Sequence, residues 1–319
     1  MTGGRDLPAA SAAGATVGRG HGKVILVGEH AAVYGHPVLA GALDRAVVLG
    51  ARPRPGPLGL DVAGWNLSVR AGDDHPVAPA LVAVAAGLGL TDGWALEGAS
   101  ELPAAAGLGS SAALAVAMTR ALAAGLGRVV TDDEVEAIAT AGERCFHGNP
   151  SGVDVALATR GGLGRFVRGQ GLTAVAGPPL VLAIGLSGQS RATAVMVERV
   201  AQARHDRPQV DVDLAALGAG AERAAAIMSG PVRDHAALAA LGAIFAEAHA
   251  RLARIGVSTP DLDAMVASAL VDGALGAKLT GGGGGGAVFA LAPGREDAVI
   301  AGWRKLGKDG FSAVVGGRP

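Results

Sequence analysis

The stretch that decides the fold of this chain runs Pro103-Ala104-Ala105-Ala106-Gly107-Leu108-Gly109-Ser110-Ser111-Ala112-Ala113. Its two glycines allow positive φ and a close approach of the backbone to an anion. Ser110 and Ser111 stand where an alanine-rich helix is expected to begin, and free N–H groups and the helix dipole favour negative charge there. The stretch lacks the Gly-Lys-Ser/Thr ending of a Walker A loop. We interpret it as a phosphate-binding loop, with an ordinary glycine turn and a serine cap as the alternative.

Three other segments are also punctuated by glycine: residues 22–30 (GKVILVGEH), 147–154 (HGNPSGVD) and 278–286 (KLTGGGGGG). In the first, Lys23 is one of only four lysines in a chain with 23 arginines. A compact ammonium suits a point contact to an oxygen, whereas a lysine at a strand end can also simply reach solvent. Glu29 and His30 follow the expected strand directly, and ligand-binding groups concentrate on such loops. His30 could equally be a core histidine.

Glu143 and Asp154 lie on either side of the Gly-Asn-Pro-Ser-Gly break, so two successive helices could bring their carboxylates together. One carboxylate could hold magnesium through oxygen. The other could accept or orient a hydroxyl proton, and a nearby lysine would favour its charged form. The alternative for both residues is a solvated or helix-capping acid.

Six consecutive glycines, residues 281–286, precede the apolar run Ala287–Leu291. A flexible linker is the usual interpretation of such a run. A linker would not normally interrupt a core, so we expect a tight turn without side chains against a ligand or a neighbouring loop.

Composition restricts the class of protein. The chain has 319 residues, half of them apolar, and a formal charge of −1 without a basic block, which argues against a nucleic-acid partner. The single cysteine, Cys145, excludes an intramolecular disulfide and fits the cytoplasm; we expect it to be a small buried hydrophobe. We find no secretory signal and no leucine-rich apolar run long enough to span a bilayer, so no membrane partner is expected.

Hydrophobic patterning predicts an α+β fold, because strands and helices do not alternate strictly. Strands are expected at Val24–Val27, Ala46–Ala51, Trp94–Glu97, Leu180–Ile184, Ala287–Leu291 and Ser312–Val315, with a hairpin around Gly64. Helices are expected at Val77–Leu88, Ala112–Leu126, from Thr131 to Phe146, from Ser151 to Thr159, over most of the chain after Thr193, and at Val299–Leu306. Thr131 is expected to cap the third of these helices, because acidic residues follow it in the first turn. We expect a flexible tail over residues 1–20 and two domains, residues 21–180 and 181–319, although no linker marks the boundary.

The four segments together resemble the motifs of the GHMP kinase superfamily. The resemblance extends from about residue 20 to residue 319. GKVILVGEHAAVYGH (22–36), ERCFHGNPSGVD (143–154) and KLTGGGGGG resemble the three motifs of the mevalonate kinase family, and the middle one is the most specific. The resemblance implies an N-terminal ATP-binding α+β domain of the ribosomal-protein-like type with a left-handed βαβ unit. It also implies a ferredoxin-like C-terminal domain, with the active site between the two.

The same resemblance implies roles for individual residues. Lys23 and Asp154 would be the catalytic pair at the 5-hydroxyl of mevalonate, and Glu143 would hold Mg²⁺ with Ser110 or, preferably, Ser111. Glu29, His30 and Thr193 would line the substrate end, together with Lys23 and Asp154. The residues expected around ATP are Pro103, Ala106, Gly107, Leu108, Gly109, Ser110, Ser111 and Ala112.

Departures from the family pattern are small. Gly282 stands where alanine is usual, and the match around Ser187–Arg191 is loose, which leaves the contacts to the substrate carboxylate open. Phosphomevalonate kinase is the nearest alternative, and Arg165, Arg168 and Arg191 could serve a second phosphate. A non-catalytic nucleotide- or metabolite-binding protein on the same fold is the alternative from another class. A homodimer is compatible with all of these readings.

Overall fold

The computed structural model describes residues 17–147, 150–189, 193–231 and 234–317. The strands in these residues are β1 (Val17–Val27), β2 (Val38–Pro53), β3 (Gly59–Ala63), β4 (Leu67–Arg70), β5 (Trp94–Ser100), β6 (Leu163–Val167), β7 (Gly171–Val175), β8 (Leu180–Leu186), β9 (Gly276–Thr280), β10 (Ala287–Leu291) and β11 (Asp309–Val315). The helices are α1 (Val77–Gly87), α2 (Ser110–Gly125), α3 (Asp132–His147), α4 (Val153–Arg160), α5 (Thr193–Asp206), α6 (Gln209–Met228), α7 (His235–Arg254), α8 (Pro260–Val271) and α9 (Glu296–Lys305). A short 3₁₀ helix, Ala31–Tyr34, follows β1.

The strands join in the order β4-β3-β5-β2-β11-β8-β10-β9, with β1 and the β6–β7 hairpin attached to β2. Nearly all pairs are antiparallel, and β3 and β5 are parallel. β2 is the centre of this arrangement, because it pairs with β1, β5, β6 and β11. The last strand of the chain therefore returns to one of the first, through the pairing of Val315 with Leu43.

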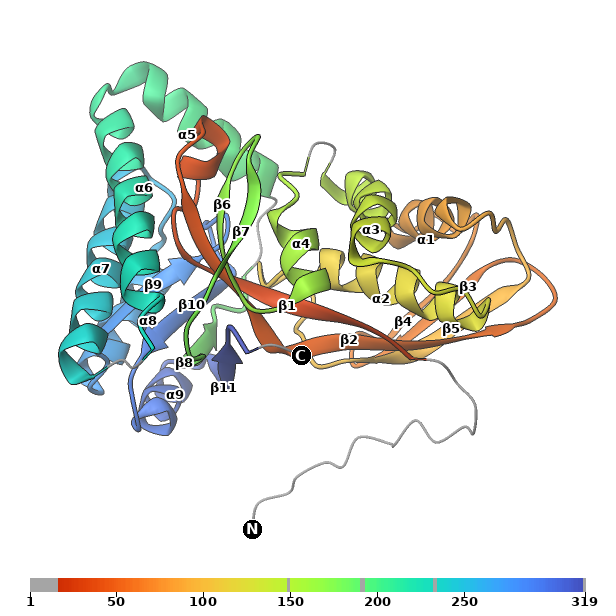
Figure 1. The fold of residues 1–319 in the computed structure, drawn as a ribbon. Helices are drawn as coiled ribbons and strands as arrows, with labels where there is room; N and C mark the ends of the chain where they lie inside the picture. Colours follow the sequence, from red (N-terminus) through yellow and green to blue (C-terminus); the bar gives the residue numbers. More distant parts are fainter. Residues whose placement is uncertain (1–16, 148–149, 190–192, 232–233, 318–319) are drawn as a thin grey trace, which may run out of the picture.

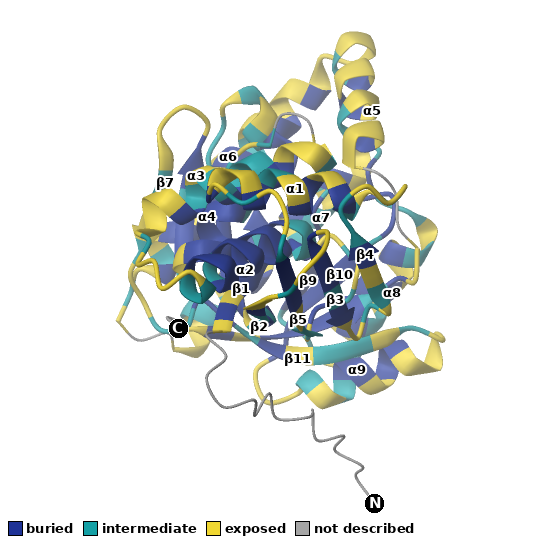
Figure 2. Ribbon diagram, turned by 90° about the vertical axis from the view of Figure 1, so that its right-hand side faces the viewer, coloured by how far each residue is buried: buried dark blue, intermediate teal, exposed yellow. Residues whose placement is uncertain are grey.

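Helices α1 to α4 gather over one part of the sheet, and α7 and α8 cover β9 and β10 at the other end (Figure 1). α6 packs on α7 and on β1 and β2. α9 packs on β8 and β11. The core of both parts is built mostly from alanine, valine and leucine, as the scarcity of aromatic residues requires. Helix α2 is largely buried, whereas α5 is largely exposed (Figure 2).

α2 lies unusually close to β1. A Cβ placed on Gly20 would lie only 2.0 Å from the carbonyl oxygen of Ala113, so a side chain at this strand position would push the helix away. The small residues of α2 and the glycines of β1 thus fix the helix directly on the strand. This contact places the beginning of α2 beside Lys23.

Most elements predicted from the sequence are present. The α+β class, the hairpin around Gly64 and the turn formed by the glycine run are confirmed. The expected Thr131 cap is confirmed as a reciprocal pair, in which Thr131 N donates to Glu134 Oε2 at 2.8 Å and Glu134 N donates to Thr131 Oγ1 at 3.2 Å.

Two expectations are wrong, and the β6–β7 hairpin was not expected. Cys145 is exposed, not buried, because it lies on the outer side of α3. The segment before Lys278, expected to be helical, contains strand β9, and its burial on both faces removed the alternation that marks a strand. The β6–β7 hairpin carries too many glycines to give a strand pattern.

By length and hydropathy α7 would be long enough and apolar enough to cross a membrane. In the fold it packs against β9 and α6, and Leu241, Phe245 and Leu252 are buried there. Core helices of globular domains commonly have this composition.

Candidate active site

Lys23 and Asp154 meet at the junction of β1 and α4. The Lys23 Nζ lies 3.3 Å from Asp154 Oδ1. The lysine side chain is almost fully buried, and the aspartate is about one-third exposed. Gly152 adopts a left-handed conformation just before α4, so that Asp154 falls in the first turn of the helix. The predicted pair is therefore together, and the exposed part of the Asp154 carboxylate can face a ligand.

A second acidic group lies next to this pair. Ser111 Oγ, in the first turn of α2, donates to Glu143 Oε1 at 3.0 Å. His147 Nε2 lies 3.4 Å from the same carboxylate oxygen and 3.3 Å from the serine hydroxyl. Burial, reinforced by the nearby charge of Asp154, raises the pKa of Glu143 to about 8. Burial also lowers the pKa of His147.

These residues fit a magnesium ion. Glu143 Oε2 is buried and has no hydrogen-bond partner among the described residues, which is costly unless a ligand occupies it. Carboxylate and hydroxyl oxygens are hard donors of the kind that Mg²⁺ prefers. No cluster of three or more His, Cys, Asp or Glu side chains suited to a metal is found in the described part of the chain. That is expected for a cation held by one or two protein oxygens and by phosphates.

The predicted phosphate loop joins β5 to α2. Gly107 and Gly109 have φ of 77° and 74°, and Ala105, which has a side chain, also has a positive φ of 53°. The loop is tied to β1 by a hydrogen bond of 2.9 Å from Lys23 N to Leu108 O. Leu108, Gly109 and Ala112 are buried, whereas Ala104, Ala105 and Gly107 are exposed. The exposed backbone before α2 and the free N–H groups of its first turn can therefore face an anion.

The glycine run is the turn between β9 and β10, and it lies against this loop. A Cβ on Gly281 would be 3.3 Å from Gly107 O, and one on Gly286 would be 3.2 Å from Ala106 O. Backbone therefore packs on backbone, as expected for a turn without side chains.

Glu29 and His30 are more buried than their predicted substrate role suggests. The Glu29 carboxylate is paired with the ammonium of Lys278, and both side chains are fully buried. Burial raises the pKa of Glu29 and lowers the pKa of Lys278, while their mutual attraction opposes both shifts. His30 Nε2 lies 2.9 Å from the carbonyl oxygen of Gly282 and donates to it. Both residues thus join the first motif to the third.

Comparison with known proteins defines the family. Residues 76–162 match the GHMP kinases N terminal domain, and residues 233–309 match the GHMP kinases C terminal domain. The mevalonate kinase of Thermococcus gammatolerans is 31% identical over 298 residues, which cover 87% of this chain and 89% of the relative. That of Pyrococcus horikoshii is 32% identical over 297 residues, which cover 87% and 88%. The chain belongs to the mevalonate kinase family of GHMP kinases.

Solved structures agree with this assignment. The crystal structure of L. major mevalonate kinase in complex with R-mevalonate superimposes on this GHMP kinase with a TM-score of 0.83 and 28% identity, over 94% of this chain and 95% of the other. The Lactococcus lactis galactokinase complexed with galactose, at 18% identity and a TM-score of 0.71, shares the fold.

Thr193, which the resemblance places near the substrate, begins α5 and is exposed. A Cβ on Gly282 would lie 3.3 Å from Thr193 Oγ1, so the alanine usual in the family would be tight at this position. Ser110 is partly exposed, and Ser111 is the serine that contacts Glu143. Gly148 and Asn149 of the middle motif, and Arg191, lie outside the described residues.

Two residues of the site had no role assigned from sequence. His147 belongs to the middle motif, and its spacing of four residues from Glu143 on one helix could have predicted the contact between the two side chains. Lys278 belongs to the third motif, but its partner Glu29 is 249 residues away in the sequence, and no local pattern predicts such a pair.

Proposed function

We propose that this GHMP kinase transfers the γ-phosphoryl group of ATP to the 5-hydroxyl of mevalonate, giving ADP and 5-phosphomevalonate. The observation that carries the proposal is the Lys23–Asp154 pair beside the Ser111–Glu143 pair, at the start of α2. The mevalonate kinases among its relatives, aligned over most of their length, support this substrate. Phosphoryl transfer depends mainly on positioning and charge neutralisation, which these groups can supply.

In this mechanism the Asp154 carboxylate accepts the proton of the substrate hydroxyl as its oxygen attacks the γ-phosphorus. The ammonium of Lys23 compensates negative charge beside the attacking oxygen. The backbone N–H groups at the start of α2 hold phosphate oxygens of ATP. When bound, Mg²⁺ neutralises charge on the phosphates, and Ser111 and Glu143 are the residues that would hold it.

Phosphomevalonate is a weaker candidate substrate. It would need cations for a second phosphate, but Arg165 is engaged by Glu222 through contacts of 2.5 to 2.9 Å. Arg168 NH1 faces the Val33 carbonyl oxygen at 3.4 Å. A non-catalytic binding protein would have no need of the complete Lys23, Glu143 and Asp154 set.

The test is ADP release by the purified protein with ATP, magnesium and one of mevalonate, phosphomevalonate, homoserine or galactose. We expect turnover with mevalonate that far exceeds turnover with the others. Turnover with phosphomevalonate or homoserine and none with mevalonate would refute the proposal. No turnover with any of them would favour the binding protein.

The magnesium assignment has its own prediction. Glu143→Gln removes the carboxylate that would be ionised when magnesium binds, so the concentration of magnesium needed for half-maximal activity should rise more than the KM for mevalonate. The check is a magnesium titration of both proteins at saturating substrates. Superimposable titration curves would dismiss Glu143 as a ligand.

We further propose that the protein works in the cytoplasm, without nucleic acid or a membrane, as a monomer or homodimer. Its balanced charge and single cysteine support this setting. Light scattering during size-exclusion chromatography would determine the oligomeric state.

A further inference from the structure

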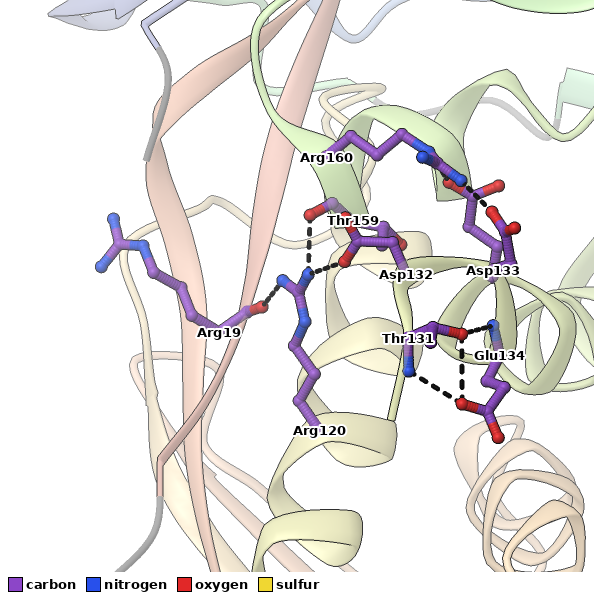
Figure 3. Close-up of polar contacts among 9 residues, drawn as sticks. Arg19, Arg120, Thr131, Asp132, Asp133, Glu134, Thr159 and Arg160 are labelled. Atoms are coloured by element: carbon purple, nitrogen blue, oxygen red, sulfur yellow. Dashed lines mark hydrogen bonds and ion pairs between the residues drawn. The ribbon is translucent and has the colours of Figure 1, made fainter. Parts of the chain in front are cut away.

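One arginine joins the elements that carry the candidate catalytic groups. Arg120 is the only charged residue in the sequence of α2, whose other residues are small or apolar. Its side chain leaves the buried helix about one-quarter exposed. A charged group in such a helix needs partners, and it finds them on three other elements (Figure 3).

The guanidinium of Arg120 makes three hydrogen bonds. NH1 donates to the Arg19 carbonyl oxygen of β1 at 2.9 Å. NH2 donates to Asp132 Oδ1 in the first turn of α3 at 2.9 Å, and to the Thr159 carbonyl oxygen in the last turn of α4 at 2.8 Å. A carbonyl at a helix C-terminus has no partner within the helix and carries partial negative charge, so a cation is well placed there.

The same elements carry the proposed catalytic and metal-binding groups. Lys23 lies on β1, Ser111 on α2, Glu143 on α3 and Asp154 on α4. Each of the two short contacts of the site joins two of these elements, β1 to α4 and α2 to α3. A shift of any one of them along its neighbour would therefore lengthen at least one contact.

We propose that Arg120 is a positioning residue, which sets the Lys23–Asp154 and Ser111–Glu143 contacts by fixing β1, α3 and α4 against α2. The effect of Arg120 on kcat rests on the proposed kinase function, whereas its effect on the two contact distances does not. The planar guanidinium can reach three acceptors at once, which a lysine ammonium at the same place cannot do with the same geometry.

The chain offers a matched control on the same helices. Arg160 of α4 pairs with Asp133 and Glu136 of α3. Among the described residues, its side chain makes no hydrogen bond or ion pair with β1 or α2, unlike that of Arg120 (Figure 3). Arg160→Met removes a cation that connects α3 with α4. Arg120→Met removes a cation of α2 that connects α3 and α4 with each other and also with β1. A difference between the two variants therefore reports the link to β1 and α2.

The experiment compares kcat, KM and melting temperature of Arg120→Met, Arg120→Lys and Arg160→Met, at a temperature well below unfolding. A displacement of about 1 Å in a catalytic group can reduce the rate about 10²-fold. We expect Arg120→Met to lose about 10- to 100-fold in kcat with KM values changed less than about threefold, Arg120→Lys to recover part of the loss, and Arg160→Met to stay near wild type. The proposal would be overturned if kcat fell equally in Arg120→Met and Arg160→Met, or if Arg120→Met kept the wild-type kcat.

A second variant covers the case in which Arg120→Met does not fold. Asp132→Asn weakens one of the three contacts at an exposed helix end, and we expect a smaller loss confined to kcat. Crystal structures of the soluble variants give a readout that needs no substrate. The Lys23–Asp154 or the Ser111–Glu143 distance should lengthen in these structures. If both distances were unchanged, the positioning role would be refuted, whatever substrate the protein proved to phosphorylate.

Discussion

The two carboxylates of the candidate site lie in different surroundings. Asp154 has a lysine partner and is partly exposed, so it is placed to meet a substrate. Glu143 is buried, has a raised pKa and keeps one oxygen without a partner among the described residues, so it is placed to meet a cation. Burial and neighbours, not residue type, thus distinguish the two acids, which suits the separate roles proposed for them.

Asp154→Asn tests the role of the exposed carboxylate. The amide is nearly isosteric but cannot accept a proton, and general-base catalysis is commonly worth about 10²–10⁴ in rate. We expect kcat to fall by about that factor while ADP affinity, measured by calorimetry, stays near wild type. A variant with wild-type kcat would reduce Asp154 to a structural residue.

His21 provides a pH dependence of stability away from the site. The side chain is buried, Nδ1 donates to the Leu43 carbonyl oxygen at 3.1 Å, and burial lowers the pKa of His21 from 6.5. Below pH 6.5 the unfolded chain therefore binds more protons than the folded one. The stability that neutral His21 supports is present above that pH and is lost as the pH falls through the lower folded pKa.

We expect His21→Gln, which keeps a donor, to gain stability relative to wild type on acidification from about pH 8 to about pH 5.5. The gain should approach about 1.4 kcal/mol for each pH unit crossed between the two pKa values of His21. Urea unfolding of both proteins at each pH measures it. His30 and His249, whose pKa values are also lowered, are common to both proteins. Parallel stability curves would contradict the assignment.

At the scale of elements, the phosphate loop and β1 depend on each other. A Cβ on Gly109 would lie 2.7 Å from Lys23 Cγ, so this glycine makes room for the lysine as well as for a ligand. A side chain at position 109 would therefore act on Lys23 as well as on a bound phosphate. A substitution there should also displace Lys23 from Asp154.

Gly109→Ala and Gly107→Ala separate these effects, because both positions have positive φ and share a conformational cost of about 1–2 kcal/mol. The nearest atom to a Cβ on Gly107 is Thr280 O at 3.7 Å, an ordinary contact. We expect both variants to melt at a lower temperature, but Gly109→Ala alone to lose about 10²-fold in kcat at saturating ATP. Equal kcat values would mean that Gly109 does not act through Lys23.

Sequence predicted the elements whose signals are local. The glycines and serines at 107–111 and the Thr131 cap act within a few residues, so the loop and helices followed from them. β9 and the exposure of Cys145 depend on what packs against them, which no local pattern encodes. For the site, the motifs predicted the Lys23–Asp154 and Ser111–Glu143 pairs, but Arg120 and Lys278 acquire their partners only through the fold.

At the scale of the whole molecule, β1 and the loop after it are bound in the core to β9, which comes about 250 residues later. Lys278 pairs with Glu29, and Thr280, two residues further along β9, exchanges hydrogen bonds of 3.0 Å with both N and O of Ile25. The alternation of a strand places both side chains on one face, directed at β1. The third motif thus connects β9 to β1 and Glu29, and it also forms the turn beside the phosphate loop.

Lys278→Met should be strongly destabilising, because it leaves the Glu29 carboxylate buried without a cation. Breaking one side of a buried pair commonly costs about 3–5 kcal/mol. The double variant Glu29→Gln/Lys278→Met, which buries no charge, should recover part of that loss in urea unfolding. A double variant that is less stable than Lys278→Met would show that the pair contributes more than mutual neutralisation.

The separation of 249 positions between Glu29 and Lys278 also affects the order in which they are synthesised. At a translation rate of about 5–20 residues per second, Glu29 leaves the ribosome roughly 12–50 seconds before its partner. Throughout that interval its carboxylate must remain hydrated or protonated, and β2 lacks β11, its neighbour from the end of the chain. The nascent N-terminal half therefore exposes the part of β2 that pairs with β11 until nearly all of the chain has been synthesised.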